Sequence, residues 1–121
     1  MRRPEQTLHR QVGAYLDAVL PSDAWWFHPP NGGKRGLVEA SILKAMGTRA
    51  GLPDIGLLRD GRCFWIELKA VDGRITKAQG TCHVRLWECG CPVTICRSID
   101  DVRSALRDWN IPTREVQARA A

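Results

Sequence analysis

Residues 53–69 read PDIGLLRDGRCFWIELK, and this stretch decides the fold. Asp60-Gly61 is a pair that favours a two-residue type I′ turn, because both turn positions need a positive φ. The apolar residues on either side of the pair indicate strands over residues 54–58 and 63–69. The stretch therefore predicts an antiparallel β-hairpin.

The register of this hairpin brings two acidic side chains together. Counting outward from the turn, Asp54 pairs with Glu67 on the same face of the sheet, with Cβ atoms about 5 Å apart. Two carboxylates placed in this way repel each other, and a cation between them removes the penalty. Mg²⁺ suits the arrangement, because it binds one or two carboxylates and keeps several waters. The sequence therefore indicates a divalent-metal site at the end of the hairpin.

Lys69 is expected on the same sheet face as Glu67, one pleat further along the strand. An ammonium group there would orient a metal-bound water or help to deprotonate it. The alternative is that Glu67 and Lys69 form an ordinary solvated ion pair and that Pro53-Asp54 is only a turn. The matched pairing, with an apolar strand between the acids, favours a catalytic arrangement.

Hydrophobic periodicity and capping residues predict four helices and two further strands around the hairpin. The helices are expected over residues 5–20, 37–46, 76–89 and 98–109, and the strands over residues 25–27 and 93–96. In the second helix, the apolar residues expected to face the core are Leu37, Ala40, Leu43 and Met46. This order of elements predicts an α/β domain with helices on the faces of a sheet.

The composition is that of a basic globular protein. Eighteen Lys and Arg against 13 Asp and Glu give a formal net charge of +5, which favours an anionic partner, although solubility also explains it. We expect one domain over residues 1–112 and a flexible tail over residues 113–121. Neither an export signal nor an apolar stretch of membrane length is seen, so a cytoplasmic location and no membrane partner are expected.

The sequence contains five cysteines: Cys63, Cys82, Cys89, Cys91 and Cys96. Their odd number and the missing export signal favour reduced thiols over disulfides. Four of them, Cys82, Cys89, Cys91 and Cys96, suggest zinc as an alternative together with His83, but the spacing matches no standard zinc pattern.

Beyond the hairpin, further stretches are similar to one known family. They are residues 28–35 (HPPNGGKR), residues 46–54 (MGTRAGLPD), and Glu67-Leu68-Lys69 followed by Gln79. In this combination the chain resembles the VRR-NUC family of virus-type replication-repair nucleases, within the PD-(D/E)XK superfamily, from about Glu5 to Trp109. The resemblance implies the restriction-endonuclease-like core, a mixed sheet flanked by helices.

The resemblance also implies roles for particular residues. The ligands of Mg²⁺ or Mn²⁺ would be Asp54, Glu67 and the backbone carbonyl of Leu68. Glu5 matches a further acidic residue that related nucleases bring to the metal, although a Glu in a first helical turn also serves as a partner of the helix dipole. Lys69 would position the attacking water, and Gln79 would belong to the family's glutamine motif. The implied reaction is phosphodiester hydrolysis without an organic cofactor.

Stand-alone members of this family are linked to the cleavage of branched DNA such as Holliday junctions, as homodimers, in replication and repair. The resemblance therefore implies DNA as substrate and a second copy of the chain as partner. We expect DNA backbone contacts from Asn31, Lys34, Arg35, Arg49, Arg74 and Lys77, with simple solubility or a turn role as the alternative for each.

Two other functions remain open at this point. One is a non-catalytic DNA-binding or assembly module that retains the nuclease fold. The other is a nuclease that prefers flap or other non-junction DNA. The intact set of Asp54, Glu67, Lys69 and Gln79 favours an active nuclease, because a binding module has no use for opposed carboxylates.

Overall fold

Within residues 3–30 and 36–115, which the computed structural model describes, four strands form one sheet. They follow one another across it as β1 (Ala24–Phe27), β2 (Ile55–Arg59), β3 (Arg62–Leu68) and β4 (Val93–Cys96). The β1–β2 and β2–β3 pairs are antiparallel, and the β3–β4 pair is parallel. The sheet is therefore mixed, as the resemblance implies.

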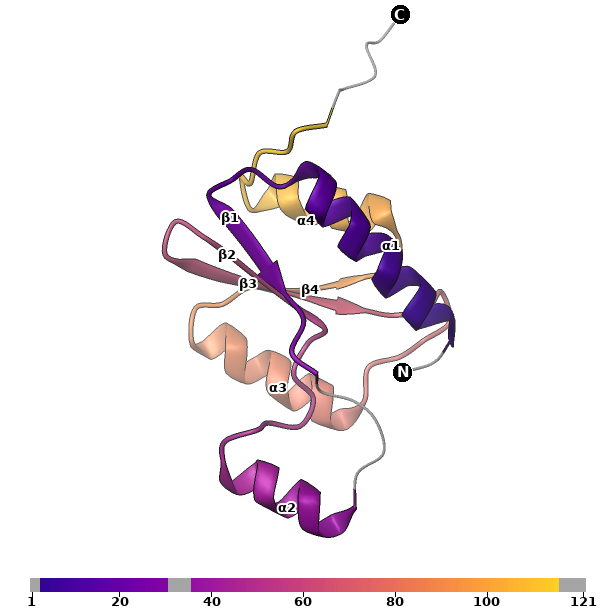
Figure 1. Ribbon diagram of the computed structural model, residues 1–121, viewed down its shortest axis with the longest axis vertical. Helices are drawn as coiled ribbons and strands as arrows, with labels where there is room; N and C mark the ends of the chain where they lie inside the picture. Colours follow the sequence, from indigo (N-terminus) through magenta and orange to yellow (C-terminus); the bar gives the residue numbers. More distant parts are fainter. Residues whose placement is uncertain (1–2, 31–35, 116–121) are drawn as a thin grey trace, which may run out of the picture.

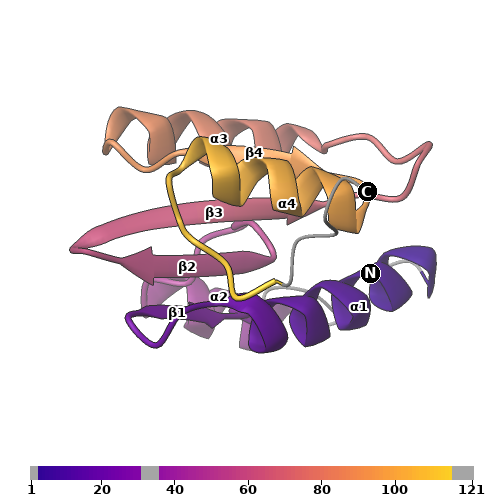
Figure 2. The same ribbon diagram turned by 90° about the horizontal axis from the view of Figure 1, so that it is seen from above.

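The helices found in the same residues cover both faces of the sheet. α1 (Arg3–Val19) and α4 (Ile99–Asp108) lie on one face, and α3 (Lys77–Glu88) lies on the other (Figure 1). α2 (Leu37–Ala45) lies beyond α3, away from the sheet, and Figure 2 shows the molecule from the side that α1 and α4 cover. The predicted α/β class is confirmed. Among the described helices, each is too short or too polar to cross a membrane.

The central hairpin has the predicted turn and register. Asp60 and Gly61 have φ values of 54° and 73°, as a type I′ turn requires. The strand pairs run from Arg59 opposite Arg62 to Ile55 opposite Ile66. One further step in this register places residue 54 opposite residue 67, at the end of the sheet where the site is expected.

The core lies between the sheet and the α1–α4 layer. It is formed by Leu8, Val12, Leu16, Val19, Leu20, Ile55, Leu57, Phe64, Ile66, Leu68, Cys96, Val102, Ala105, Leu106 and Ile111. Burying one such large side chain stabilises the fold by about 1.5–3 kcal/mol. Because side chains alternate along a strand, β3 points its core residues toward α1 and α4 and points Trp65 and Glu67 toward α3.

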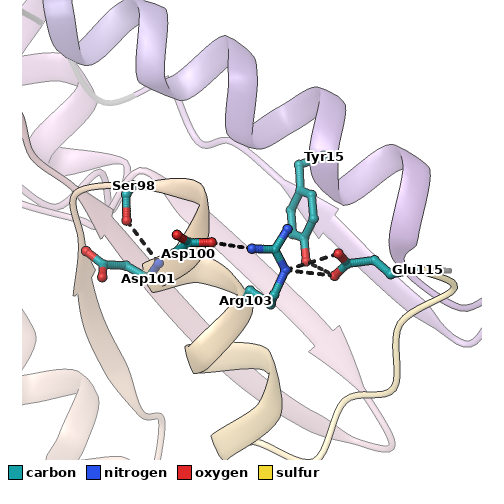
Figure 3. A network of polar contacts seen from close by, with 6 residues as sticks. All are labelled: Tyr15, Ser98, Asp100, Asp101, Arg103 and Glu115. Carbon is teal, nitrogen blue, oxygen red and sulfur yellow. Dashed lines mark hydrogen bonds and ion pairs between the residues drawn. The ribbon is translucent and has the colours of Figure 1, made fainter. Parts of the chain in front are cut away.

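A polar network joins α1, α4 and the segment that follows α4 (Figure 3). The hydroxyl of Tyr15 donates to Glu115, whose carboxylate also accepts from Nε of Arg103 at 3.0 Å. Arg103 also pairs with Asp100 on its own helix. The backbone N–H of residue 114 donates to the carbonyl of Val19 at 2.7 Å. The segment predicted as a tail therefore begins with residues that are held against the helices, and residues 116–121 lie outside the described chain.

The prediction that α2 packs its apolar residues into the core is wrong. Leu37, Ala40 and Met46 are exposed, and none of residues 37–45, all of which the structure describes, is buried. Helical periodicity identifies an apolar face of a helix, but it does not say whether another element covers that face. Here α3 already covers this face of the sheet, so α2 lies outside it with Leu37 91% exposed.

Candidate active site

Asp54 directly precedes β2 and is held by a residue of β3 and by the residue that follows β1. Its Oδ2 accepts a hydrogen bond of 2.8 Å from the backbone N–H of Leu68 on β3. Its backbone carbonyl lies 2.6 Å from Nδ1 of His28, which directly follows β1. These contacts fix the carboxylate at the end of the hairpin, beside Glu67.

Glu67 is 1% exposed and lies on the α3 face of β3. Burial is the main cause that raises the pKa of its carboxyl group well above the ordinary value, and the hydrogen bond and charge of Asp54 raise it further. The charge of Lys69 opposes this rise, and that of Glu5 adds to it. Two acids in such contact either share a proton or are neutralised by a cation. The two carboxyl groups therefore meet as the hairpin register predicts.

Lys69 directly follows β3 and is 6% exposed. The charge of its ammonium group lowers the pKa of the Glu67 carboxyl, against the larger effect of burial. The segment after it is tied down by Arg97, whose guanidinium donates to the carbonyls of Ala70 and Gly73, each at 2.7 Å. The backbone on both sides of Lys69 is thus held, by its strand and by this clamp.

Gln79 joins the first turn of α3 to the acid pair. Its side-chain oxygen accepts from the backbone N–H of Thr76 at 2.8 Å, and its backbone N–H donates to the Thr76 hydroxyl at 3.1 Å. This reciprocal capping box fixes the start of the helix. The side-chain Nε2 then donates to Oε2 of Glu67 at 3.4 Å. Gln79 therefore lies in the site, as its place in the motif implies.

Glu5 reaches the same site from α1. It is 8% exposed, and its Oε1 accepts from the backbone N–H of Ala70 at 3.4 Å. It lines one cavity of about 660 Å³ together with His9, Arg10, Asp54, Glu67 and Gln79. Glu5 therefore lies in the site and is not only a partner of the α1 helix dipole.

The donor set limits how a metal ion would be held. Among the described residues, no group of three or more His, Cys, Asp or Glu side chains is arranged to enclose a metal, and the five cysteines are free thiols. A cation here would rely on Asp54 and Glu67, a backbone carbonyl and several waters. This oxygen-rich, water-completed set fits Mg²⁺ or Mn²⁺ and not a structural zinc ion.

The sequence-based prediction missed His83 as a site residue. Its Nε2 lies 2.9 Å from Oε1 of Glu67, and its side chain is 12% exposed. Burial lowers the pKa of His83, and the charge of Lys69 lowers it further. The signal for it was its spacing, because residues four apart on a helix share a face and His83 follows Gln79 by four.

His9 and His28 form a second histidine contact at the rim of the cavity. Their rings meet edge to face, with centroids 4.3 Å apart. Burial is the main cause that lowers the pKa of His9, and His28 adds to the effect. His9 follows Glu5 by four residues on α1, so the same spacing rule would have found it.

The predicted DNA contacts divide into two groups. Arg49, Arg74 and Lys77 are exposed, and Arg49 and Lys77 line a second cavity of about 740 Å³ between the 49–52 loop and α3. Asn31, Lys34 and Arg35 lie outside the described residues. Arg10, at the main cavity, is a basic residue that the sequence-based prediction did not include.

Gly51 places the loop before Asp54 directly against α3, and we expect it to be intolerant of a side chain. It has a φ of +78°, and a Cβ there would lie 2.3 Å from the carbonyl oxygen of Ala78. Strain and overpacking at this position predict that Gly51→Ala lowers the free energy of unfolding by about 3 kcal/mol. Urea denaturation monitored by circular dichroism measures the change.

Gly90→Ala is the matched control for this prediction, because Gly90 has a φ of +80° with nothing within 4 Å of the added Cβ. It should lose only about 1 kcal/mol. Equal losses in the two variants would mean that the contact between the loop and α3 is not tight.

Comparison with known proteins gives the fold. No protein-family model and no curated protein matches the sequence. A solved structure described as a VRR_NUC domain protein superposes with a TM-score of 0.69 at 24% identity, over 90% of this chain and 89% of the other. A second, described as a VRR_NUC domain, gives a TM-score of 0.62 at 16% identity, over 89% and 99%. The chain therefore shares the fold of these VRR_NUC structures.

Proposed function

We propose that this protein is an intracellular, metal-dependent DNA endonuclease that hydrolyses phosphodiester bonds in branched DNA such as Holliday junctions. The observation that carries the proposal is the contact between two carboxyl groups, Asp54 and Glu67, with the buried Lys69 two residues after Glu67. The fold shared with VRR_NUC domains supports the same nuclease function. A buried acid pair lowers stability unless it serves a charged ligand, so its presence points to function.

Asp54, Glu67 and the carbonyl of Leu68 would hold Mg²⁺ or Mn²⁺. Such an ion, when bound, polarises a phosphate oxygen and lowers the pKa of a coordinated water. The residues of the chain set the geometry for this chemistry: the Leu68 N–H holds Asp54, and Gln79 holds Glu67. Glu5 adds negative charge at the same place and would favour a divalent over a monovalent cation.

Lys69 is the residue assigned to the attacking water and to the developing charge. Its buried ammonium group donates hydrogen bonds to the water and to a phosphate oxygen in this proposal. Negative charge grows on the phosphate in the transition state, and a fixed cation in a site with little water offsets it. Arg97 holds the backbone that follows the lysine, through the carbonyls of Ala70 and Gly73.

DNA would be bound mainly through its phosphates. Arg49, Arg74 and Lys77 are exposed on the α3 side, and Arg10 lies at the mouth of the cavity. With a formal net charge of +5, the protein attracts nucleic acid by electrostatics and not by base contacts. We propose the same backbone contacts for Asn31, Lys34 and Arg35.

A cleavage assay on labelled four-way, flap and linear DNA tests the function, with Mg²⁺, Mn²⁺ or EDTA present. We expect metal-dependent cutting that is fastest on the four-way junction. Faster cutting of flaps would favour the alternative substrate. Binding of DNA without cutting in either metal would reject the enzyme and favour the non-catalytic module.

A second copy of the chain is the partner that we propose for α2. The helix exposes Leu37, Val38 and Ile42, and Met46 follows it, with exposed fractions from 55% to 91%. A contiguous apolar face of this kind marks an interaction surface. A four-way junction needs two cuts, and a two-fold dimer supplies two active sites.

We therefore expect Ile42→Glu to weaken self-association by about 100-fold, because a two-fold interface carries each change twice. Sedimentation velocity over a concentration series measures the dissociation constant. Val71→Glu is the control, since Val71 is 87% exposed and lies outside α2. If the wild-type protein is monomeric at all concentrations, both the proposed dimer and the proposed role of α2 are wrong.

A further inference from the structure

One face of α3 presents two hydrogen-bonding side chains to the two oxygens of a single carboxylate. Nε2 of Gln79 lies 3.4 Å from Oε2 of Glu67, and Nε2 of His83 lies 2.9 Å from Oε1. The two residues are one helical turn apart, which is the spacing that stacks side chains on the same face. Glu67 is therefore held at both of its oxygens by one helix.

The contact with His83 is the shorter and more enclosed of the two. The side chains of His83 and Glu67 are 12% and 1% exposed, so water competes little for either group. A hydrogen bond to a charged carboxylate is stronger than one between neutral groups, and more of its strength is kept where water is excluded. The His83 contact thus controls the orientation of Glu67 more strongly than the 3.4 Å contact from Gln79 does.

We infer that His83 is a positioning residue, whose ring N–H holds the Glu67 carboxylate in the orientation that binds the catalytic metal ion. The inference rests on the function proposed above and adds a residue to it. With Oε1 fixed by His83, the carboxylate is preorganised beside Asp54. Losing an outer partner of a metal-binding carboxylate weakens metal affinity by about 10- to 100-fold.

Two substitutions separate this role from a purely structural one. His83→Leu fills a similar volume but donates no hydrogen bond. His83→Gln keeps an N–H donor at about the reach of Nε2. Val84→Ala is the matched control, because the neighbouring Val84 is 59% exposed on the outer side of α3. Circular dichroism and thermal unfolding establish that each variant is folded.

The experiment titrates Mn²⁺ into the full chain without DNA and measures binding by isothermal titration calorimetry. We expect His83→Leu to bind Mn²⁺ about 10- to 100-fold more weakly than the wild type, and His83→Gln to stay within about threefold of it. Val84→Ala should match the wild type. In cleavage assays, His83→Leu should need more Mn²⁺ for half-maximal rate but should recover much of that rate at saturation.

Other outcomes of the Mn²⁺ titration distinguish failure of the His83 role from failure of the proposed metal site. Equal Mn²⁺ affinity in His83→Leu and wild type would overturn the role of His83 and leave the nuclease proposal standing. Equal losses in the Gln and Leu variants would show that the hydrogen bond is not what matters, which also overturns it. A wild-type protein that binds no Mn²⁺ would instead reject the proposed metal site itself, and the inference would fall with it.

Discussion

Replacing Lys69 with alanine should lower the rate of DNA cleavage by about 10²- to 10³-fold, the usual loss when one charge-stabilising donor is removed from an active site. The affinity for DNA should change by less than about twofold. These two expectations follow from where the lysine lies. Lys69 is 6% exposed, so in our proposal it contacts only the scissile phosphate inside the site, while exposed basic residues bind the flanking phosphates.

The measurement needs chemistry and binding to be separated. Single-turnover cleavage of a four-way junction at saturating enzyme and Mg²⁺ gives the rate of the chemical step. Fluorescence anisotropy in EDTA gives the affinity without cutting. If Lys69→Ala cleaves DNA without metal, or cleaves at the wild-type rate, the role assigned to Lys69 is wrong.

Lys77→Ala provides the opposite pattern as a control. Lys77 is exposed at the first position of α3 and has no contact with the acid pair in our proposal. Its loss should weaken binding on all DNA sequences and lower the slope of affinity against salt by about 0.9, as expected for one phosphate contact. Its single-turnover rate at saturating enzyme should be close to that of the wild type.

The hairpin and its acid pair could be predicted because their determinants are local. Asp60-Gly61 allows few turn geometries, and the turn fixes the register of every pair beyond it. Once the register is known, the alternation of β3 assigns Glu67 and Lys69 to one face. Thr76 and Ser98 marked the starts of α3 and α4 for the same reason, since a capping side chain bonds within its own turn.

The residues that were missed, or whose role was left open, depend on how distant elements pack. His83 becomes a site residue only because α3 is rotated with that face toward Glu67, and α3 buries none of its described residues, so its apolar pattern carries no signal of this rotation. Glu5 could be a metal-site residue or a dipole partner until α1 was seen to bring it to Ala70, 65 positions away. The prediction for α2 was wrong because an apolar helix can pack on a sheet only where a face is uncovered. α3 already covers this face (Figure 1).

Glu67→Gln should abolish metal-dependent cleavage and at the same time stabilise the metal-free protein at pH 8. Glutamine keeps an oxygen for the His83 contact but removes the charge that faces Asp54. Burial and Asp54 raise the pKa of the Glu67 carboxyl in the folded protein. Ionising Glu67 therefore costs more in the folded than in the unfolded state, and the stability present below the unfolded pKa is lost as pH rises through the folded pKa.

The two proteins should thus be equally stable near pH 4 and should diverge above it. At pH 8 in EDTA the variant should be more stable by at least about 1 kcal/mol, which shifts the melting temperature by about 4 °C in a domain of this size. Glu39→Gln, which removes an exposed carboxylate on α2, should leave the pH profile unchanged.

Magnesium should reverse the order of stability. An ion that binds the folded state alone raises the melting temperature of the wild type, and the variant, with one carboxylate removed, should gain little. Differential scanning fluorimetry from pH 4 to 8, with EDTA or Mg²⁺, measures both effects in one series. If the variant is less stable than the wild type at pH 8 in EDTA, ionised Glu67 beside Asp54 does not destabilise the metal-free protein. If Mg²⁺ stabilises both proteins equally, Glu67 is not a ligand of the ion.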